Sequence, residues 1–187
     1  MSAALDDRGR AFLRELARLA VAAAARGQEP PAARARAAAR GLRLEGALAE
    51  PRGVFVTLSR GGQLRGCIGS LTGRLPLAEA VAASARNAAV GDPRFPPVAP
   101  AELDRLELEI SVLSPLRSVA GPDGIEVGRH GVLLEKDGRQ AVFLPQVAPE
   151  QGWDRDTMLA HLARKAGLPA DGWRRGAVFM VFTADVF

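Results

Sequence analysis

One segment, residues 54–69, constrains the fold of this chain more than any other, because its pattern is that of a β-hairpin. Residues 54–58 read Val-Phe-Val-Thr-Leu, a run of the β-branched, aromatic and aliphatic side chains that favour strands. Gly61-Gly62 follows as a two-residue turn of the kind that joins antiparallel strands. Residues 63–69 then return as a second strand. The sequence therefore predicts an antiparallel sheet built around this hairpin.

Helices and further strands are predicted on both sides of the hairpin from apolar periodicity and from Gly, Pro and Asp boundary signals. Runs of strands separated by helices, without strict strand-helix-strand alternation, indicate an α+β fold with a mainly antiparallel sheet and packed helices. The expected helices cover 7–26, about 32–40, 76–90 and a segment capped by Asp154 and closed by Gly167. The other expected strands cover 106–112, 125–128, 131–136, 139–144 and 178–182.

The length of 187 residues fits one domain, which we expect to span 1–187 with a helical part at 1–50 and a sheet-containing part at 51–187. No apolar run reaches the ~18 residues of a membrane-spanning helix. The first seven residues contain two aspartates and do not resemble a secretory signal. We therefore expect a cytoplasmic protein without a membrane partner.

Charge and residue counts exclude several functional classes. All but two of the 25 basic residues are arginine, and the formal net charge is only +4. Arg36, Arg40 and Arg43 share one helical face, a pattern that we interpret as a solvated surface in preference to a nucleic-acid site. One cysteine and two histidines offer no metal-ligand spacing, and no nucleotide-binding or zinc-hydrolase motif occurs. We expect neither a metal nor a cofactor.

Cys67 lies in the most unusual part of the hairpin, between Gly66 and Gly69. Glycines inside a strand often mark a bulge or the close approach of another group, such as a ligand. A strand period of two would place Arg65 beside Cys67, where the cation would favour the nucleophilic thiolate. Alternatively, the two-residue turn would pair Cys67 with Val56, which would make the thiol a small buried apolar group. Both interpretations stay open.

Five other residues are candidates for a site, and all except Gln146 also have a structural alternative. His130 lies at a predicted strand junction, either at the lip of a site or as a turn histidine bonded to the backbone. Asp92 and Arg94 suit an anion clamp with Phe95 as its platform, or a turn ion pair with Phe95 in the core. Gln146 follows a strand and offers an amide for polar recognition.

Several motifs, in order, resemble the AMMECR domain family, known in bacteria as the A component of the AmmeMemoRadiSam system. The resemblance covers nearly the whole chain and is weakest at residues 30–50. The motifs that carry it are Gly53-Val54-Phe55-Val56-Thr57-Leu58, Leu64-Arg65-Gly66-Cys67-Ile68-Gly69, Ala88-Ala89, Asp92-Pro93-Arg94-Phe95, Glu102-Leu103, Ile110-Ser111-Val112-Leu113, His130-Gly131, Leu144-Pro145-Gln146-Val147, Lys165-Ala166-Gly167-Leu168 and Val186-Phe187.

This resemblance implies an α+β protein of two subdomains with a cleft, in which residues 65–69 belong to the functional segment. It also implies a pathway shared with a Memo-type protein and a radical SAM enzyme. One hypothesis is a pathway component that binds a small or peptide-borne anionic ligand around residues 64–69; the other is a non-catalytic scaffold. The candidate catalytic residues are Cys67 and His130, and the candidate ligand-binding residues are Arg65, Gly66, Gly69, Asp92, Arg94, Phe95 and Gln146.

Overall fold

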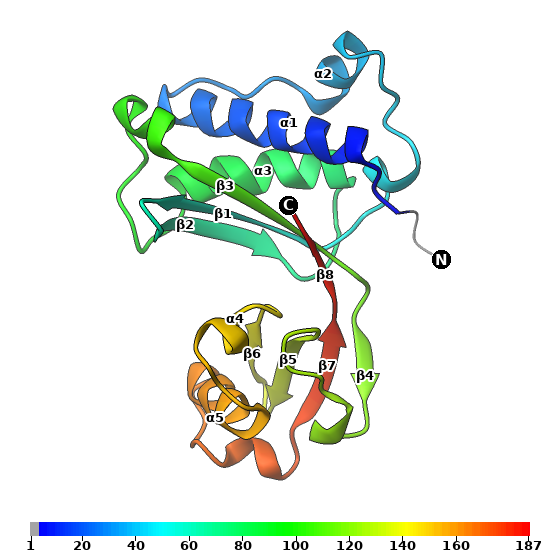
Figure 1. Cartoon of the computed structure of the whole chain (residues 1–187), viewed down its shortest axis with the longest axis vertical. Coiled ribbons are helices and arrows are strands. Elements are labelled where there is room, and N and C mark those ends of the chain that lie inside the picture. The colour runs from blue at the N-terminus through cyan, green and yellow to red at the C-terminus, as the bar shows by residue number, and fades with distance from the viewer. Residues whose placement is uncertain (1–3) are drawn as a thin grey trace. The chain divides into compact units, whose positions relative to one another are not determined.

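The computed structural model describes residues 4–187 and divides them into two compact units (Figure 1). The first unit comprises the chain up to Leu113 together with Asp185–Phe187, and the second comprises Ser114–Ala184. Each unit has its own antiparallel sheet and its own helices, which confirms the predicted α+β class. In the described residues, no helix is both long enough and apolar enough to cross a membrane.

The first unit contains a four-stranded sheet in the order β2-β1-β3-β8, so that β2 is an edge strand. The predicted hairpin is confirmed, and β1 pairs antiparallel with both β2 and β3. The short last strand was not predicted, because three residues carry too little periodicity to identify a strand. The strands are β1 (Val54–Arg60), β2 (Gln63–Ser70), β3 (Glu107–Leu113) and β8 (Ala184–Val186).

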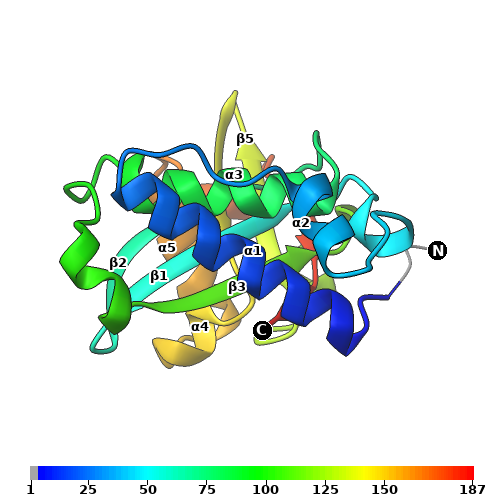
Figure 2. The ribbon, with the colours of Figure 1, turned by 90° about the horizontal axis from the view of Figure 1, so that it is seen from above.

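Two helices cover one face of this sheet, as Figure 2 shows from above. Along α1, buried residues such as Phe12, Leu13 and Leu16 recur every three or four positions and face the core. They pack in one cluster with Val56 and Leu58 of β1. Burying each such large apolar side chain contributes about 1.5–3 kcal/mol. The helices are α1 (Asp7–Ala25), the short α2 (Ala33–Ala39) and α3 (Leu77–Val90).

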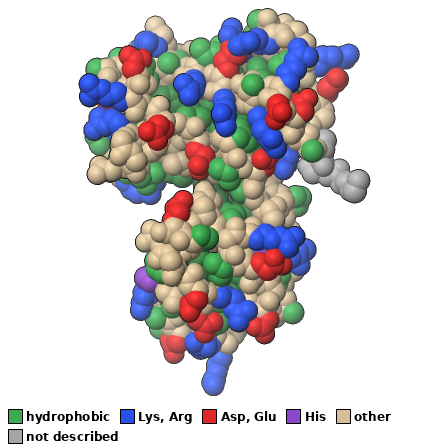
Figure 3. Space-filling model, viewed as in Figure 1, with side chains coloured by type: hydrophobic (Ala, Val, Ile, Leu, Met, Phe, Trp, Pro, Cys, Tyr) green, Lys and Arg blue, Asp and Glu red, His purple; other side chains and the backbone are tan. Residues whose placement is uncertain are grey.

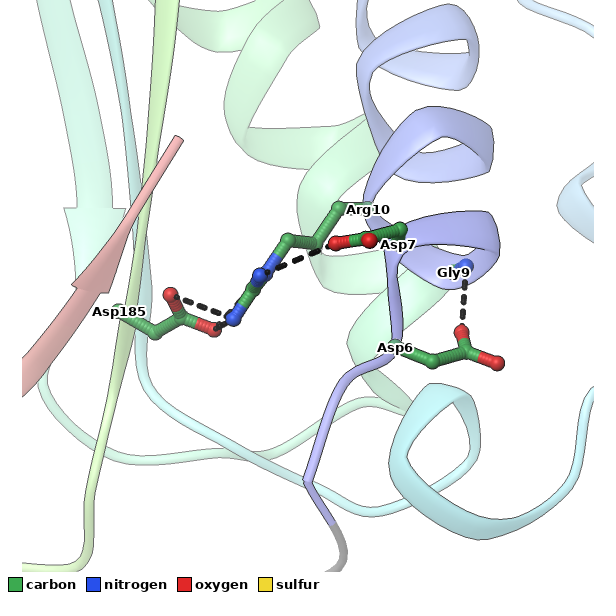
Figure 4. Close-up of polar contacts among 5 residues, drawn as sticks. All are labelled: Asp6, Asp7, Gly9, Arg10 and Asp185. Atoms are coloured by element: carbon green, nitrogen blue, oxygen red, sulfur yellow. Dashed lines mark hydrogen bonds and ion pairs between the residues drawn. The ribbon is translucent and has the colours of Figure 1, made fainter.

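Side chains at the beginning of α1 hold both the helix and the C-terminal strand, as Figure 4 shows. Asp6 caps α1, because its carboxylate accepts the Gly9 N–H at 2.7 Å. The Arg10 guanidinium donates to both carboxylate oxygens of Asp185, at 3.2 and 3.0 Å from Nη2. This forked ion pair ties the end of the chain to α1 within the first unit.

The Arg36, Arg40 and Arg43 side chains do not form a stripe of unbalanced positive charge. Arg36 and Arg40 both bind the Glu15 carboxylate, and Arg43 lies 3.4 Å from Glu45. Figure 3 likewise shows acidic side chains interspersed with the basic ones on the visible face of this unit. The basic residues of this segment are therefore largely matched by local carboxylates.

The second unit contains a four-stranded sheet in the order β4-β7-β5-β6 with every pair antiparallel. Asp154 caps α5 as predicted, accepting the Thr157 N–H at 2.8 Å. Leu159, Leu162 and Trp173 form part of the core of this unit. The elements are β4 (Arg117–Val119), β5 (Gly131–Lys136), β6 (Arg139–Phe143), α4 (Val147–Glu150), α5 (Arg155–Lys165) and β7 (Val178–Phe182).

The strand predicted at 125–128 is wrong. Gly128 has a φ of +85°, and the N–H of His130 donates to the Glu126 carbonyl at 2.9 Å. These features form a tight turn, which a left-handed glycine accommodates and an extended strand does not. The predicted strands at 131–136, 139–144 and 178–182 are confirmed to within one residue.

Candidate functional site

The register of the hairpin differs from the predicted one at the motif 64–69. Leu58 lies opposite Gly66, but Ser59 lies opposite Leu64, so Arg65 is an extra residue in a β-bulge. Beyond the bulge Cys67 pairs with Thr57, and its predicted pairing with Val56 is wrong. The bulge shifts the pairing by one residue and therefore changes which side chains face the thiol.

Cys67 is half-buried and lies on the face of the sheet opposite α1 and α3, because Val56 and Leu58 face those helices. Its Sγ lies 3.2 Å from Oγ1 of Thr57. The Cys67 backbone is held from outside the sheet, where its N–H donates to Asp92 at 2.9 Å and its carbonyl accepts from Arg94 at 3.3 Å. The side chains of Asp92 and Arg94 thus provide hydrogen-bond partners for the Cys67 N–H and carbonyl at the outer edge of β2.

Asp92 and Arg94 form a close ion pair on the loop that follows α3. Nε and Nη2 of Arg94 donate to the two carboxylate oxygens of Asp92 at 2.9 and 2.7 Å. These hydrogen bonds hold the pKa of the buried Asp92 carboxyl well below its ordinary value of 3.8. Arg94 also lies over the ring of Phe95, with its Cζ 5.5 Å from the ring centroid. The charge of Arg94 is therefore already balanced within the loop, while Phe95 is half-buried and lies outside the core cluster of the first unit.

Arg65 is likewise paired within the protein. Its guanidinium donates to both carboxylate oxygens of Glu102, at 2.9 and 3.0 Å, and to the Pro97 carbonyl at 3.2 Å. Glu102 also accepts from Arg60 and from the Ala99 N–H. Hydrogen bonding to Arg65 is the main reason that the pKa of Glu102 falls from 4.5 to about 2. Arg65 therefore ties the bulge to the segment after the Asp92–Arg94 loop.

The two glycines of the motif admit the protein's own backbone. A Cβ on Gly66 would lie 2.1 Å from the Ala88 carbonyl oxygen of α3, and one on Gly69 would lie 2.1 Å from that of Val54. Both distances are impossible for a real side chain. Close packing of α3 and β1 against β2 therefore explains both glycines without a ligand at either Cβ position.

A cavity of about 230 Å³ lies between the end of β2 and α3, wholly within the first unit. It contains two arginines and no acidic residue, and it combines hydroxyl and amide groups with apolar walls. Neither Arg52 nor Arg74 has a carboxylate within ion-pair distance among residues 4–187. The lining residues are Arg52, Val54, Ile68, Gly69, Ser70, Thr72, Arg74, Leu75, Ala80, Ala83, Ser84 and Asn87.

His130 and Gln146 belong to the second unit, whereas the other candidate residues belong to the first. Nδ1 of the buried His130 accepts the Glu126 N–H at 3.0 Å, so a neutral imidazole carries its proton on Nε2. The backbone carbonyl of Gln146 accepts the Glu150 N–H at 3.1 Å where α4 begins, whereas its side-chain Oε1 is buried without a hydrogen-bond partner among the described residues. His130 therefore has the contacts of a turn histidine bonded to the backbone.

The comparisons with known proteins agree with this architecture. The AMMECR1 family model matches residues 14–187. The chain belongs to the AMMECR1 family. Among its relatives, protein MK0488 of Methanopyrus kandleri is 45% identical over 150 residues, which cover 75% of this chain and 72% of that protein. Protein TK0174 of Thermococcus kodakarensis is 48% identical over 149 residues, covering 74% and 73%.

A solved structure extends the AMMECR1 assignment to the fold. The crystal structure of the uncharacterized protein PH0010 from Pyrococcus horikoshii matches with a TM-score of 0.83 and 39% identity. The match covers 94% of this chain and 88% of that one. The α+β architecture described above is therefore also that of this solved protein.

Sequence reasoning missed several residues of this AMMECR1 chain that determine the chemistry around the motif. Glu102 neutralises Arg65; the residue was noted only as part of the family motif Glu102-Leu103, and its role as the partner of Arg65 was not predicted. Arg52 and Arg74 lie just outside the predicted elements, where no periodicity distinguishes them from other surface arginines. Among the described residues, no group of three or more His, Cys, Asp or Glu is placed to hold a metal ion.

Proposed function

We propose that this AMMECR1 protein is the ligand-binding component of a modification pathway that includes a Memo-type protein and a radical SAM enzyme. It binds a small or peptide-borne anionic group in the cavity next to Ile68, Gly69 and Ser70. The observation that carries this proposal is the cavity lining, which contains Arg52 and Arg74 and no acidic residue.

The chemistry of the lining favours carboxylate or phosphate. An arginine guanidinium presents a planar fork of N–H donors that matches two oxygens of either group. Ser70, Thr72 and Asn87 add hydroxyl and amide groups to the same cavity. A volume of about 230 Å³ lies below the ~300–1,000 Å³ typical of drug-sized ligand pockets. The cavity therefore suits one anionic group and its neighbouring atoms.

The surroundings of the other arginines support this choice of site. Arg65 is already bonded to Glu102, and Arg94 is already bonded to Asp92. A second anion at either guanidinium would compete with a carboxylate held within a few ångströms. Arg52 donates only a long hydrogen bond of 3.4 Å to the Leu113 carbonyl, and Arg74 is exposed. Compared with Arg65 and Arg94, these two side chains are therefore available to an incoming anion in the cavity.

The test is a titration of the protein with inorganic phosphate and with glutarate, in which binding is measured from the NMR shifts of the backbone amides. We expect both anions to shift the amides of residues 68–72 in the unmodified protein. The double variant Arg52→Gln with Arg74→Gln should weaken binding at least tenfold. Arg86→Gln is the matched control, because Arg86 is exposed on α3 and does not line the cavity. Equal affinity of the double variant and the control would refute the proposal.

A further inference from the structure

The outer edge of β2 is open at Gly69. The Cys67 N–H and carbonyl point away from β1, since both bond to side chains outside the sheet. In a regular antiparallel pair the backbone direction alternates, so Gly69 points outward as well. Among residues 4–187, no loop or side chain hydrogen-bonds to Gly69, and no strand lies beyond β2. Its N–H and carbonyl are therefore available to a further strand.

This open position lies in the wall of the cavity already described. Gly69 forms one side of it, and α3 forms the other through Ala80, Ala83, Ser84 and Asn87, which share one helical face. From Ala80 to Asn87 the helix rises about 10 Å, the length of about three residues of extended chain. Three of these four side chains are Ala or Ser, which occupy little of the space beside the helix.

The neighbouring position shows which groups this strand edge accepts. At Cys67 a carboxylate oxygen of Asp92 takes the N–H, and the guanidinium of Arg94 reaches the carbonyl. Together these side chains replace the acceptor and the donor that a neighbouring strand would supply. Gly69 lines the cavity together with Arg52 and Arg74. Hydrogen bonds to a strand edge beside a helix, with a charged anchor, suit an extended peptide.

We infer that the occupant of this cavity is an extended acidic peptide segment that adds to β2 at Gly69. Its backbone exchanges hydrogen bonds with the Gly69 N–H and carbonyl, its side chains lie along α3, and its carboxylate binds Arg52 and Arg74. This inference rests on the proposed function, because it assigns a peptide to the same anion-binding cavity. It distinguishes a peptide from a free small anion, which would need the arginines but not the strand edge.

The test compares probes that differ in one group each. The parent probe is acetyl-Val-Ala-Val with a free C-terminal carboxylate. The others are its C-terminal amide and three versions that are each N-methylated at a different residue. Affinity is measured by NMR titration of the full chain, with hydrogen exchange of the Gly69 amide as a second measurement. The Arg52→Gln and Arg74→Gln double variant and the Arg86→Gln control are titrated in parallel.

We expect the free acid to bind at least tenfold more tightly than the amide. At least one N-methylated version should bind at least tenfold more weakly than the parent probe. The Gly69 amide should exchange more slowly when the free acid is bound. If all N-methylated versions bind as well as the parent and Gly69 exchange is unchanged, the peptide inference is wrong. If phosphate binds and no peptide binds, the inference also fails but the anion site stands. If neither phosphate nor peptide binds, both fail.

Discussion

The backbone N–H of Cys67 donates to Oδ2 of Asp92 across 2.9 Å, although the two residues lie 25 positions apart in the chain. The carboxylate thus occupies the place that a carbonyl of a neighbouring strand would take. This contact links the motif 64–69 to the loop after α3. It gives the Cys67 backbone a structural role that is independent of its thiol.

Replacing Asp92 should destabilise the first unit. Asp92→Ala removes the acceptor of the Cys67 N–H and leaves the Arg94 guanidinium without its carboxylate, and we expect a loss of about 2–3 kcal/mol in the free energy of unfolding. Urea denaturation measures it. Asp104→Ala, at an exposed position, is the matched control and should change stability by less than about 0.5 kcal/mol. Equal effects of both variants would show that the edge contact contributes nothing.

The stability of the protein should fall with acid through Glu102. The pKa of Glu102 is depressed in the folded state from 4.5 to about 2. The contribution of its ionised carboxylate to the free energy of unfolding is therefore complete above pH 4.5 and disappears as the pH falls toward 2. Glu102→Gln lacks this titration, so the difference in unfolding free energy between the unmodified protein and the variant should shrink between these values. Urea denaturation at several pH values from 7 to 2.5 measures that difference. A difference that is constant with pH would contradict the assignment of the Arg65–Glu102 pair.

Gly66 should tolerate no side chain. In Gly66→Ala the new Cβ would meet the Ala88 carbonyl at 2.1 Å, which forces α3 away from β2. We expect a loss of at least ~3 kcal/mol, at the upper end of overpacking effects. Gly121→Ala is the control, since nothing lies within 4 Å of its Cβ position and its backbone is extended. Thermal unfolding of the two variants tests this, and an unshifted transition in Gly66→Ala would show that the helix and strand are not in contact.

Substitution of Cys67 distinguishes a protein that only binds its ligand from one that uses a reacting thiol. We expect Cys67→Ala to cost about 1 kcal/mol of stability, because it leaves a small cavity beside Thr57. Its affinity for phosphate and for the acidic peptide should stay within twofold of the unmodified protein, since Cys67 does not line the cavity. The same titration as above measures this affinity. Intact folding and binding together with complete loss of pathway output in a Cys67→Ala strain would instead identify a reacting thiol.

Local signals in the sequence sufficed for most of the elements. The strand run at 54–58, the Gly61-Gly62 turn and the Asp154 cap each depend on residues that are neighbours in the chain. The α+β class follows from their order. The strand predicted at 125–128 was wrong because a left-handed Gly128 overrides a short apolar run. Three-residue strands such as β8 are too short to show periodicity.

The candidate site depended on contacts that no local pattern contains. The bulge at Arg65 places Cys67 opposite Thr57, and the Ala88 carbonyl of α3 packs closely on Gly66. The partners of Arg65 and Cys67, Glu102 and Asp92, lie 37 and 25 positions away. By itself the sequence determined which segments form strands and helices, because hydrogen bonding and apolar periodicity act between near neighbours. Only the tertiary structure decided which arginines are neutralised and which line an open cavity, because that depends on side chains brought together by packing.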